Sequence, residues 1–374
     1  MRIGLVCPYN IFKNGGVQEC VLALKSEYQK KGHEAYIITP RPKGVESENV
    51  DGILLVGQSR DFNSPFQSTT AQVSVNFDNA AIDALLHEYQ FDVLHFHEPW
   101  VPIVGRQVLN RSNTVNVATF HAKLPDTMMS KTIEKVITPY TKSILKYIDS
   151  FTAVSEAAAE YIKSLTSAEI SLIPNGIDID KFRSTGKSER DKHTILYLGR
   201  LEKRKGVIYL LRAFQQLKTV HSEAKLIIAG DGPERSKLEN YVELNDIEDV
   251  EFVGFVDEST KIKMLHSATI YCSPAIYGES FGIVLLEAMA AGAITVAGNN
   301  PGYAGVLKDT GAVSIVNVKD TTEFARRLQL LMIDTELRKL WTSWADDYVA
   351  QFDYTRIAEL YLKVYRLAKK AHME

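Results

Sequence analysis

Cysteine is scarce in this 374-residue sequence: only Cys7, Cys20 and Cys272 occur, and none belongs to a CxxC pair. An odd number of cysteines in apolar surroundings is typical of reduced, buried thiols, so we expect a cytoplasmic protein without a disulfide framework. The sequence also lacks an apolar run long enough to cross a membrane, and its first residues, MRIGLVC, are too short for the apolar core of a signal peptide. Any membrane contact is therefore expected to be peripheral.

A strong charge of one sign is absent as well. The chain has 43 Lys and Arg residues against 46 Asp and Glu residues, which gives a formal net charge of -3. This balance provides no global basic field of the kind that attracts nucleic acid, so we expect no nucleic-acid partner. The composition of 45% hydrophobic and 24% charged residues is that of a soluble globular protein, and the length is sufficient for two domains.

Both halves of the chain alternate apolar runs with helical patterns, which is typical of βα units in a parallel sheet. The predicted strands lie at 2–9, 34–40, 92–99, 116–122 and 150–154 in the first half, and at 194–200, 224–230, 251–256, 268–274 and 293–298 in the second. A polar connector, 171–193, separates the halves, and Ser155 is a predicted helix N-cap. We predict an α/β protein with domains 1–170 and 171–354, and a final helix, 355–374, that packs back onto the first domain.

The segment YGESFGIVLLEAMAAG, 277–292, contains two glutamates in a run that otherwise resembles a buried helix. Gly278 and Gly282 bracket Glu279 and allow the backbone to approach a ligand just before a helix start, where free N–H groups and the helix dipole attract phosphate. Glu287 lies one to two turns into the helix, within reach of ribose hydroxyls. The alternative is that Glu287 is a solvated helix residue and Glu279 a loop charge, but the apolar sequence neighbours of Glu287 predict a buried acid that requires a partner.

Taken together, the motifs of this chain resemble those of the retaining glycosyltransferases of family 4, which have the GT-B fold. ESFGIVLLE matches the family's two glutamates separated by seven residues, and the resemblance extends through NGGVQ, HFHEP, ATFHA, AVSE, IPNGID, LGRLEKRKG, AGDGP and GNNPG. The likeness is greatest to the bacterial phosphatidylinositol α-mannosyltransferases. The resemblance implies two Rossmann-like domains that face each other across a cleft, with acceptor contacts from the first and donor contacts from the second.

The resemblance also implies how a nucleotide-sugar donor is held. Arg200 and Lys205 resemble the basic pair that neutralises the leaving diphosphate, although Lys203 and Arg204 are rivals by charge alone and a solvated basic turn is the alternative. Glu279 is expected near the sugar as a catalytic residue. The donor-binding residues implied in total are Gly15, Gly16, Arg200, Lys205, Val256, Phe281, Gly282, Ile283, Val284 and Glu287. For the two N-terminal glycines, an ordinary tight turn after the first strand is the alternative.

His121 ends a predicted strand at the sheet edge where ligands collect, and by resemblance it is the catalytic-site histidine that contacts the transferred sugar. His95 and His97 alternate on a strand, so both rings project to one face, but the spacing of the sequence offers no third metal ligand, and we expect a structural role or a place in the lining of the active site. Asp178 and Asp180 mimic the metal-binding DxD motif of another glycosyltransferase fold, but they lie in the connector, and the resemblance implies a family that does not depend on such a motif. We therefore expect no metal and no cofactor. Tyr9 and Gln18 match positions that contact the inositol phosphate of the acceptor in the similar enzymes.

The implied reaction transfers a hexose, with mannose from GDP-mannose preferred, to a polar or lipid-linked acceptor such as phosphatidylinositol. No carboxylate nucleophile is evident on the opposite face, so the resemblance implies front-face attack with retention, in which the departing phosphate oxygen takes the acceptor proton. A UDP-sugar donor with another glycan or glycolipid acceptor and a catalytically silent nucleotide-sugar-binding module are the alternatives. A dinucleotide oxidoreductase is disfavoured because NGGVQE lacks the GxGxxG spacing.

Two departures weaken the acceptor assignment. The phosphatidylinositol enzymes carry a strongly basic helix before the HEP strand, whereas FDNAAIDALLHEYQ, 77–90, has acids and no Lys or Arg. Trp100 replaces the polar residue expected after HEP. A compensating basic and apolar pattern occurs at 123–147, with Lys123, Lys131, Lys135, Lys142 and Lys146. It predicts either peripheral contact with the cytoplasmic face of a membrane or an ordinary surface helix.

Overall fold

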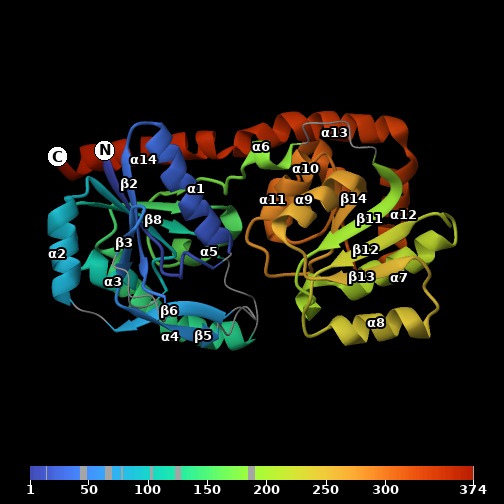
Figure 1. The fold of residues 1–374 in the computed structure, drawn as a ribbon, viewed down its shortest axis with the longest axis horizontal. Coiled ribbons are helices and arrows are strands. Elements are labelled where there is room, and N and C mark those ends of the chain that lie inside the picture. Colours follow the sequence, from blue (N-terminus) through green and yellow to red (C-terminus); the bar gives the residue numbers. More distant parts are fainter. Residues whose placement is uncertain are drawn as a thin grey trace. The chain divides into compact units, whose positions relative to one another are not determined.

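The computed structural model of the protein describes residues 1–13, 15–42, 49–63, 70–76, 79–101, 104–122, 128–183 and 190–373. The chain divides into two compact units (Figure 1). The first contains Met1–Gly176 together with Tyr354–Glu374, and the second contains Ile177–Asp353. The change of unit after Gly176 lies six residues beyond the boundary expected from the sequence, and the C-terminal helix belongs to the first unit.

The first unit is built on an eight-stranded sheet with the strand order β10-β9-β8-β7-β1-β2-β4-β3. Its strands are β1 (Arg2–Val6), β2 (Glu34–Pro40), β3 (Asn49–Val50), β4 (Ile53–Val56), β7 (Val93–His97), β8 (Val115–Phe120), β9 (Ser150–Ala153) and β10 (Ile170–Leu172). All neighbours are parallel except β3 and β4. A separate antiparallel pair is formed by β5 (Gln58–Asn63) and β6 (Thr70–Asn76). Because β8, β7 and β1 are adjacent and parallel, their carboxyl ends meet at one edge of the sheet.

Helices cover this sheet, and the C-terminal one completes its core. The helices are α1 (Gly16–Lys30), α2 (Asn79–Tyr89), α3 (Val104–Leu109), α4 (Met128–Leu145), α5 (Glu156–Lys163) and α14 (Tyr354–Met373). The predicted N-cap Ser155 is confirmed, since its side chain accepts the N–H of Ala158. Helix α14 packs against α1 and β8. The hydroxyl of Tyr365, which is fully buried, lies 3.0 Å from that of Tyr28 and 2.6 Å from His95 Nδ1.

The second unit contains a six-stranded parallel sheet with the order β13-β12-β11-β14-β15-β16. Its strands are β11 (Asp191–Leu198), β12 (Lys225–Ala229), β13 (Val250–Gly254), β14 (Ala268–Ser273), β15 (Ile294–Gly298) and β16 (Ile315–Val316). Its helices are α6 (Ile179–Phe182), η1 (Lys203–Lys205), α7 (Val207–Lys218), α8 (Arg235–Leu244), α9 (Glu258–Ser267), α10 (Ile283–Ala290), α11 (Pro301–Val306), η2 (Asp309–Ser314), α12 (Thr321–Ile333), α13 (Thr335–Val349) and η3 (Ala350–Phe352). Helix α7 packs against α12, and α10 packs against α13.

The sequences of the strands are continuous apolar runs because helices bury both faces of each sheet. Every residue of β14 and β15 is buried, as is every residue of β7 and β8. The predicted α/β class with two Rossmann-like parallel sheets is confirmed. The connector is more regular than its composition predicts: it contains α6, which Asp178 caps by accepting the N–H of Lys181. This capping role accounts for one of the two acids of the Asp178–Asp180 pair.

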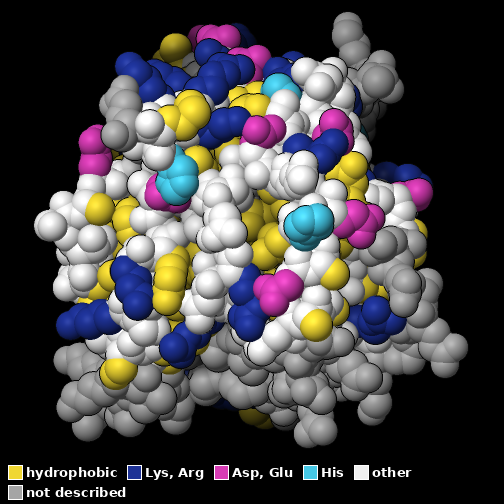
Figure 2. All heavy atoms as spheres, turned by 90° about the vertical axis from the view of Figure 1, so that its left-hand side faces the viewer, with side chains coloured by type: hydrophobic (Ala, Val, Ile, Leu, Met, Phe, Trp, Pro, Cys, Tyr) yellow, Lys and Arg dark blue, Asp and Glu magenta, His cyan; other side chains and the backbone are white. Residues whose placement is uncertain are grey.

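The surface of the first unit carries charges of both signs. Figure 2 shows the side of the molecule on which Figure 1 places α2, and there Lys and Arg side chains are interspersed with Asp and Glu. The exposed charged or titratable side chains of α2 itself are Asp83, His87 and Glu88. Within the described residues, no helix combines the length and apolar character needed to span a bilayer.

Candidate functional site

Two histidines meet at the carboxyl edge of the first sheet. His97 ends β7, and His121 follows the last residue of the neighbouring strand β8. His97 Nδ1 lies 2.9 Å from His121 Nε2, and both side chains are buried. The rings of His95 and His97 are 4.1 Å apart between centroids, so they share one face of the sheet as predicted.

Burial keeps these imidazoles neutral at neutral pH. It lowers the pKa of His121 to about 4, although a hydrogen bond to Asn175 opposes the shift. Burial lowers the pKa of His95 to about 3 and that of His97 well below its ordinary value. His95 is bound on both sides, since its Nε2 lies 2.6 Å from Thr119 Oγ1 and its Nδ1 contacts α14. His95 is therefore structural, whereas His121 is a neutral hydrogen-bonding group at the sheet edge.

Glu98, which the sequence analysis did not single out, holds the turn that follows β8. Its Oε1 accepts the backbone N–H groups of His121 and Ala122, both at 2.6 Å. Only 1% of Glu98 is exposed, and burial raises the pKa of its carboxyl group to about 7 while the two N–H groups lower it. The HEP motif contained this residue, but no sequence rule distinguishes a buried glutamate that binds amides from one that faces solvent.

The glycine turn after β1 leads into α1 as predicted. Gly15 is the N-cap, and no side chain caps the helix there. The amide of Gln18 lies over this glycine, because a Cβ added at Gly15 would be 2.4 Å from Gln18 Oε1. Tyr9 is half-buried, and burial with the nearby charge of Glu98 raises the pKa of its hydroxyl. Tyr9, Gly15, Gly16 and Gln18 thus occupy the loop and first helical turn that follow one strand, beside the strands that end near His97 and His121.

A third potential metal ligand lies beside the two histidines. Cys20, on α1, His97 and His121 each offer one ligand atom, and these three atoms lie within 4.8 Å of one another. Thiolate and imidazole are ligands that Zn²⁺ accepts. Against such a site, burial raises the pKa of Cys20 to about 12, and the two imidazoles already bind each other. The sequence spacing did not reveal this convergence because the three residues come from three separate elements.

The second unit presents a chain of alternating charges after β11. Arg204 Nη1 and Lys205 Nζ each lie 2.8 Å from Glu279 Oε1. Glu202 binds on the other side, with its carboxylate 3.0 Å from Arg200 Nε and 2.9 Å from Arg204 Nε. The two cations expected to act as a pair, Arg200 and Lys205, are therefore at opposite ends of the chain. Arg204, a rival by charge alone, lies at its centre.

Backbone packing fixes this chain. Burial lowers the pKa of Arg204, but the charges of Glu279 and Glu202 outweigh burial and raise that pKa above its ordinary value. Gly206 ends η1 with φ +70°, and a Cβ there would lie 2.2 Å from the carbonyl oxygen of Pro274. The N–H of Ile276 in turn donates to the carbonyl of Arg204 at 2.8 Å. The segment 200–205, which we call the basic turn, and the segment that carries Glu279 are thus packed backbone to backbone.

Helix α10 begins next to Glu279 and contains Glu287 in its second turn. Gly282 is its N-cap, without a side-chain cap, and Phe281 is buried while Ile283 and Val284 are half-buried. Glu287 is buried, and its Oε1 lies 3.0 Å from Nζ of Lys261 on α9. The expectation that this acid is buried and paired is confirmed, although the sequence did not identify Lys261.

The segment 298–303, GNNPGY, supports the loop of Glu279 from the other side. Asn300 caps α11 and donates from Nδ2 to the carbonyl of Ala275 at 3.0 Å. A Cβ at Gly302 would lie 2.3 Å from the carbonyl oxygen of Glu279. Val256, the remaining residue implied in donor binding, is half-buried between β13 and the N-cap of α9. The second unit therefore collects Val256, Glu279, Glu287 and the basic turn in the loops and helix starts that follow its strands.

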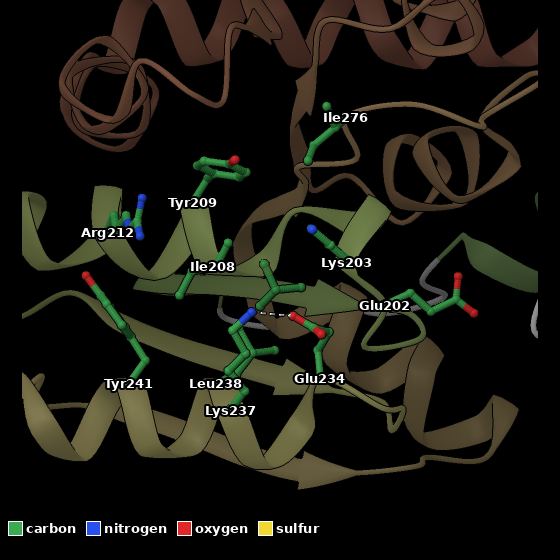
Figure 3. Close-up of a pocket in the computed structure, with 11 residues that line it drawn as sticks. Glu202, Lys203, Ile208, Tyr209, Arg212, Glu234, Lys237, Leu238, Tyr241 and Ile276 are labelled. Atoms are coloured by element: carbon green, nitrogen blue, oxygen red, sulfur yellow. Dashed lines mark hydrogen bonds and ion pairs between the residues drawn. The ribbon is translucent and has the colours of Figure 1, made fainter. Parts of the chain in front are cut away.

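A groove of about 300 Å³ lies between α7 and α8 (Figure 3). Its lining residues are Glu202, Lys203, Val207, Ile208, Tyr209, Arg212, Glu234, Lys237, Leu238, Tyr241 and Ile276. Arg212 Cζ lies 5.8 Å from the ring centroids of both Tyr209 and Tyr241. Arg200, Lys205, Glu279 and Glu287 are not among the lining residues, but Glu202, which pairs with Arg200 and Arg204, is, so the groove adjoins the cluster of expected donor contacts without containing it.

Comparison with known proteins agrees with this arrangement over both units. Residues 14–181 match Glycosyltransferase Family 4, and residues 178–346 match Glycosyl transferases group 1. The phosphatidyl-myo-inositol mannosyltransferase of Mycolicibacterium smegmatis is 31% identical over 99% of this chain and 95% of its own length. The protein of that name from Propionibacterium freudenreichii is 29% identical over 98% of this chain and 95% of its own length.

Solved structures share the fold. Sucrose-phosphate synthase from Thermosynechococcus elongatus has a TM-score of 0.77 at 20% identity, with 99% of both chains covered. Anabaena Alr3699/HepE in complex with UDP has a TM-score of 0.75 at 18% identity, with 97% of this chain and 99% of that chain covered. The two Rossmann-like units are those of the GT-B fold, and the full-length sequence similarity shows that the chain belongs to family 4 of the glycosyltransferases.

Proposed function

We propose that this glycosyltransferase transfers mannose from GDP-mannose to phosphatidylinositol or a closely related polar lipid. The observation that carries the proposal is the similarity, at about 30% identity and over nearly the whole chain, to several proteins named phosphatidyl-myo-inositol mannosyltransferase. The similarity covers both units, so it includes the loops of the donor and acceptor residues alike.

The second unit is proposed to bind the donor. The basic turn provides Arg200, Arg204 and Lys205 for the diphosphate, and the start of α10 adds backbone N–H groups. Glu287 is proposed to bind the ribose hydroxyls, which requires it to share or exchange its contact with Lys261. Val256 and the apolar first turn of α10 complete the proposed contacts.

The first unit is proposed to bind the acceptor and to supply His121. Tyr9 and Gln18 provide polar groups for an inositol phosphate, and Gly15 and Gly16 provide backbone N–H groups for the donor diphosphate. His121 is neutral at neutral pH, so its imidazole is suited to accept or donate a hydrogen bond to the sugar rather than to act as a cation.

The proposed reaction retains the anomeric configuration. The C–O bond between the sugar and the diphosphate breaks, the acceptor oxygen attacks the same face, and the departing phosphate oxygen takes the acceptor proton. The sugar becomes oxocarbenium-like in this step, and the cations of the basic turn stabilise the negative charge that develops on the leaving group. Glu279 is proposed to bind sugar hydroxyls. An inverted product anomer in the NMR spectrum of the reaction mixture would contradict this scheme.

We propose that the reaction requires no divalent metal ion. Three cations, Arg200, Arg204 and Lys205, lie in one turn, and this positive charge can take over the role that Mg²⁺ plays toward diphosphates in other transferases. The Cys20, His97 and His121 group is of a soft-ligand type that does not suit Mg²⁺.

A UDP-sugar-dependent transferase with another acceptor is the second candidate. It is favoured by α2, which has no Lys or Arg, and by Trp100 after the HEP motif, because both depart from the pattern of the phosphatidylinositol enzymes. A nucleotide-sugar-binding module without transfer activity is the third. The joint presence of His121, Lys205 and Glu279 argues against it.

Contact with the cytoplasmic face of a membrane is part of the first proposal. In the basic segment 123–147, the side chains of Lys123, Lys131 and Lys135 lie outside the described residues. Lys142 on α4 and Lys146, which follows this helix, are exposed, while Ile144 on α4 is buried. Buried and exposed positions at helical spacing are equally compatible with an ordinary surface helix, so co-sedimentation with anionic and neutral vesicles is required to test membrane binding.

The central experiment separates donor from acceptor. Thermal unfolding is followed with GDP, UDP, GDP-mannose and UDP-glucose, and the best donor is then incubated with phosphatidylinositol vesicles and analysed for lipid-linked sugar. The proposal expects stabilisation by GDP and GDP-mannose and a mannosylated lipid. Stabilisation by UDP and a UDP-sugar alone would support the second candidate, and stabilisation by a nucleotide sugar without any transfer product would support the third.

A further inference from the structure

The residue that follows β7 has an unusual backbone conformation, and no role has been assigned to it. Glu98 follows β7 and has φ +51°, in the left-handed region that side chains other than glycine rarely adopt. Its N–H donates to the carbonyl of Thr119 on β8 at 2.9 Å. This conformation is unfavourable by itself, so another interaction of Glu98 must stabilise it.

That interaction is the pair of hydrogen bonds to the segment carrying His121. Glu98 Oε1 accepts two consecutive backbone N–H groups, from His121 and Ala122, at 2.6 Å each. Two convergent donors on one oxygen restrict the direction in which the chain leaves β8. The side chain of His121 is then oriented by its contact with His97 at 2.9 Å. Glu98 thus fixes the backbone of the histidine, and His97 fixes its ring.

Only one carboxylate oxygen of Glu98 is used in this arrangement. Oε2 is buried and takes no part in these two hydrogen bonds, and the side chain of Trp100 also interacts with the carboxyl group and lowers its pKa. The contacts with the segment of His121 therefore require a hydrogen-bond acceptor at Oε1, and they do not require a second acceptor. A glutamine can provide the same acceptor with its amide oxygen.

We propose that Glu98 is a positioning residue for sugar transfer, which holds His121 in its reactive orientation through the two backbone amides. This inference rests on the proposed function, because it assigns to Glu98 a role in the reaction that His121 serves. Glu98 acts through His121 and does not itself react. The donor contacts assigned to the second unit do not depend on it.

The test compares Glu98→Ala, Glu98→Gln and a matched control, Glu27→Ala. Glu27 is also a buried glutamate of the first unit, on α1, where it pairs with Lys30. We expect Glu98→Ala to lower kcat about a hundredfold, since small displacements of a catalytic group have effects of this size, and to leave KM for GDP-mannose within threefold of wild type. Glu98→Gln should keep at least a third of the wild-type kcat, and Glu27→Ala should keep its kcat.

The outcomes distinguish the inference from the proposed function. If the wild-type protein transfers no mannose from GDP-mannose, the proposed function fails, and the three variants are measured with the donor that the nucleotide screen identifies. If wild type is active and Glu98→Ala has its kcat, the inference is overturned. A folded, donor-binding Glu98→Gln as inactive as Glu98→Ala would also overturn it, because the negative charge would then be required.

A backbone variant tests the inference if Glu98→Ala does not fold. Ala122→Pro removes one of the two N–H donors and leaves Glu98 in place. We expect a decrease in kcat of about tenfold with unchanged thermal stabilisation by GDP, in line with the loss of half of the contact. A wild-type kcat in Ala122→Pro would overturn the inference.

Discussion

The ion pair between Lys261 and Glu287 provides a direct test of the electrostatics of the second unit. Lys261 Nζ lies 3.0 Å from Glu287 Oε1, with 9% of the glutamate side chain and 24% of the lysine side chain exposed. The lysine also lies 5.1 Å from the ring centroid of Phe182. We predict that Glu287 is tolerated in its apolar environment because Lys261 compensates its charge.

The expected magnitudes follow from this burial. Removing one partner of a buried ion pair costs about 3–5 kcal/mol, and because water can reach Lys261 we take about 3 kcal/mol for Lys261→Met. Glu287→Gln leaves the charge of Lys261 unpaired, and because this side chain is more exposed than that of Glu287, the variant should cost about 1 kcal/mol. The double variant has no unpaired charge, so it should cost about 1–2 kcal/mol rather than the sum of about 4, which is a coupling energy of about 2 kcal/mol or more.

The assay is urea unfolding followed by tryptophan fluorescence in a Trp100→Phe background. Trp341 and Trp344 lie on α13 of the second unit, and Trp341 is fully buried, so the remaining fluorescence reports on this unit. Lys263→Met is the control, because Lys263 is on the same helix and exposed. It should change the free energy of unfolding by less than about 0.5 kcal/mol.

The refuting result is additivity. If the double variant is destabilised by the sum of the two single variants, to within about 0.5 kcal/mol, Lys261 does not compensate Glu287. The buried glutamate would then have to be stabilised by its helix alone. Equal effects of Lys261→Met and Lys263→Met would lead to the same conclusion.

Three further predictions concern the charges of both units and the metal requirement. Glu279→Gln should bind GDP about threefold to tenfold more tightly than wild type and transfer sugar at least about a hundredfold more slowly, whereas Lys205→Ala should lose both GDP affinity and turnover. Calorimetry measures the affinities and product assays measure the turnover. Near-normal turnover in either variant would contradict the role assigned to that residue. Burial lowers the pKa of His95 to about 3 and that of His121 to about 4, so the unfolded chain takes up protons between about pH 6.5 and pH 4 that the folded chain does not, and stability should fall as the pH falls through this window. The urea midpoint is measured in a Glu98→Gln background, which removes the opposite effect of the raised pKa of Glu98, and a midpoint that stays constant from pH 7 to pH 4.5 would contradict the burial of neutral histidines. Treatment with EDTA followed by desalting should leave the rate of transfer unchanged, and restoration of a lost rate by Mg²⁺ or Mn²⁺ would refute the metal-independent proposal.

The sequence predicted the elements of this fold because its signals are local. Apolar runs that are buried on both faces identified the parallel strands, and Ser155 was recognisable as an N-cap from its position before a helical pattern. The burial of Glu287 was predictable for the same reason, since its apolar neighbours lie on the same helix. The strand Ile53–Val56 was missed although it is a short apolar run with every residue buried, and the two-residue strand Ile315–Val316 is too short to give a periodic signal.

The partners within the site were less predictable, because they come from separate elements. Lys261 lies 26 positions before Glu287, and only the place of α9 in the fold brings it, rather than another lysine, to Glu287. Likewise, four cations of the basic turn have the same charge in the sequence, and the backbone of η1 decides that Arg204 and Lys205 reach Glu279. For Glu98 the HEP motif marked the residue but not its role, since that role depends on a left-handed backbone conformation that its residue type does not favour.

The chain of alternating charges explains why Glu279 is expected to oppose nucleotide binding while it assists transfer. Without a ligand, Glu279 is the shared partner of Arg204 and Lys205, so the basic turn holds its cations in place without leaving their charge unbalanced. A diphosphate must compete with this carboxylate for Lys205, whereas Arg204 retains Glu202 as a second partner. Phosphate binding would therefore release Glu279, and the released carboxylate could bind the hydroxyls of the attached sugar. Competition for the cation thus couples the two events, and removing the carboxylate should strengthen the first while it abolishes the second.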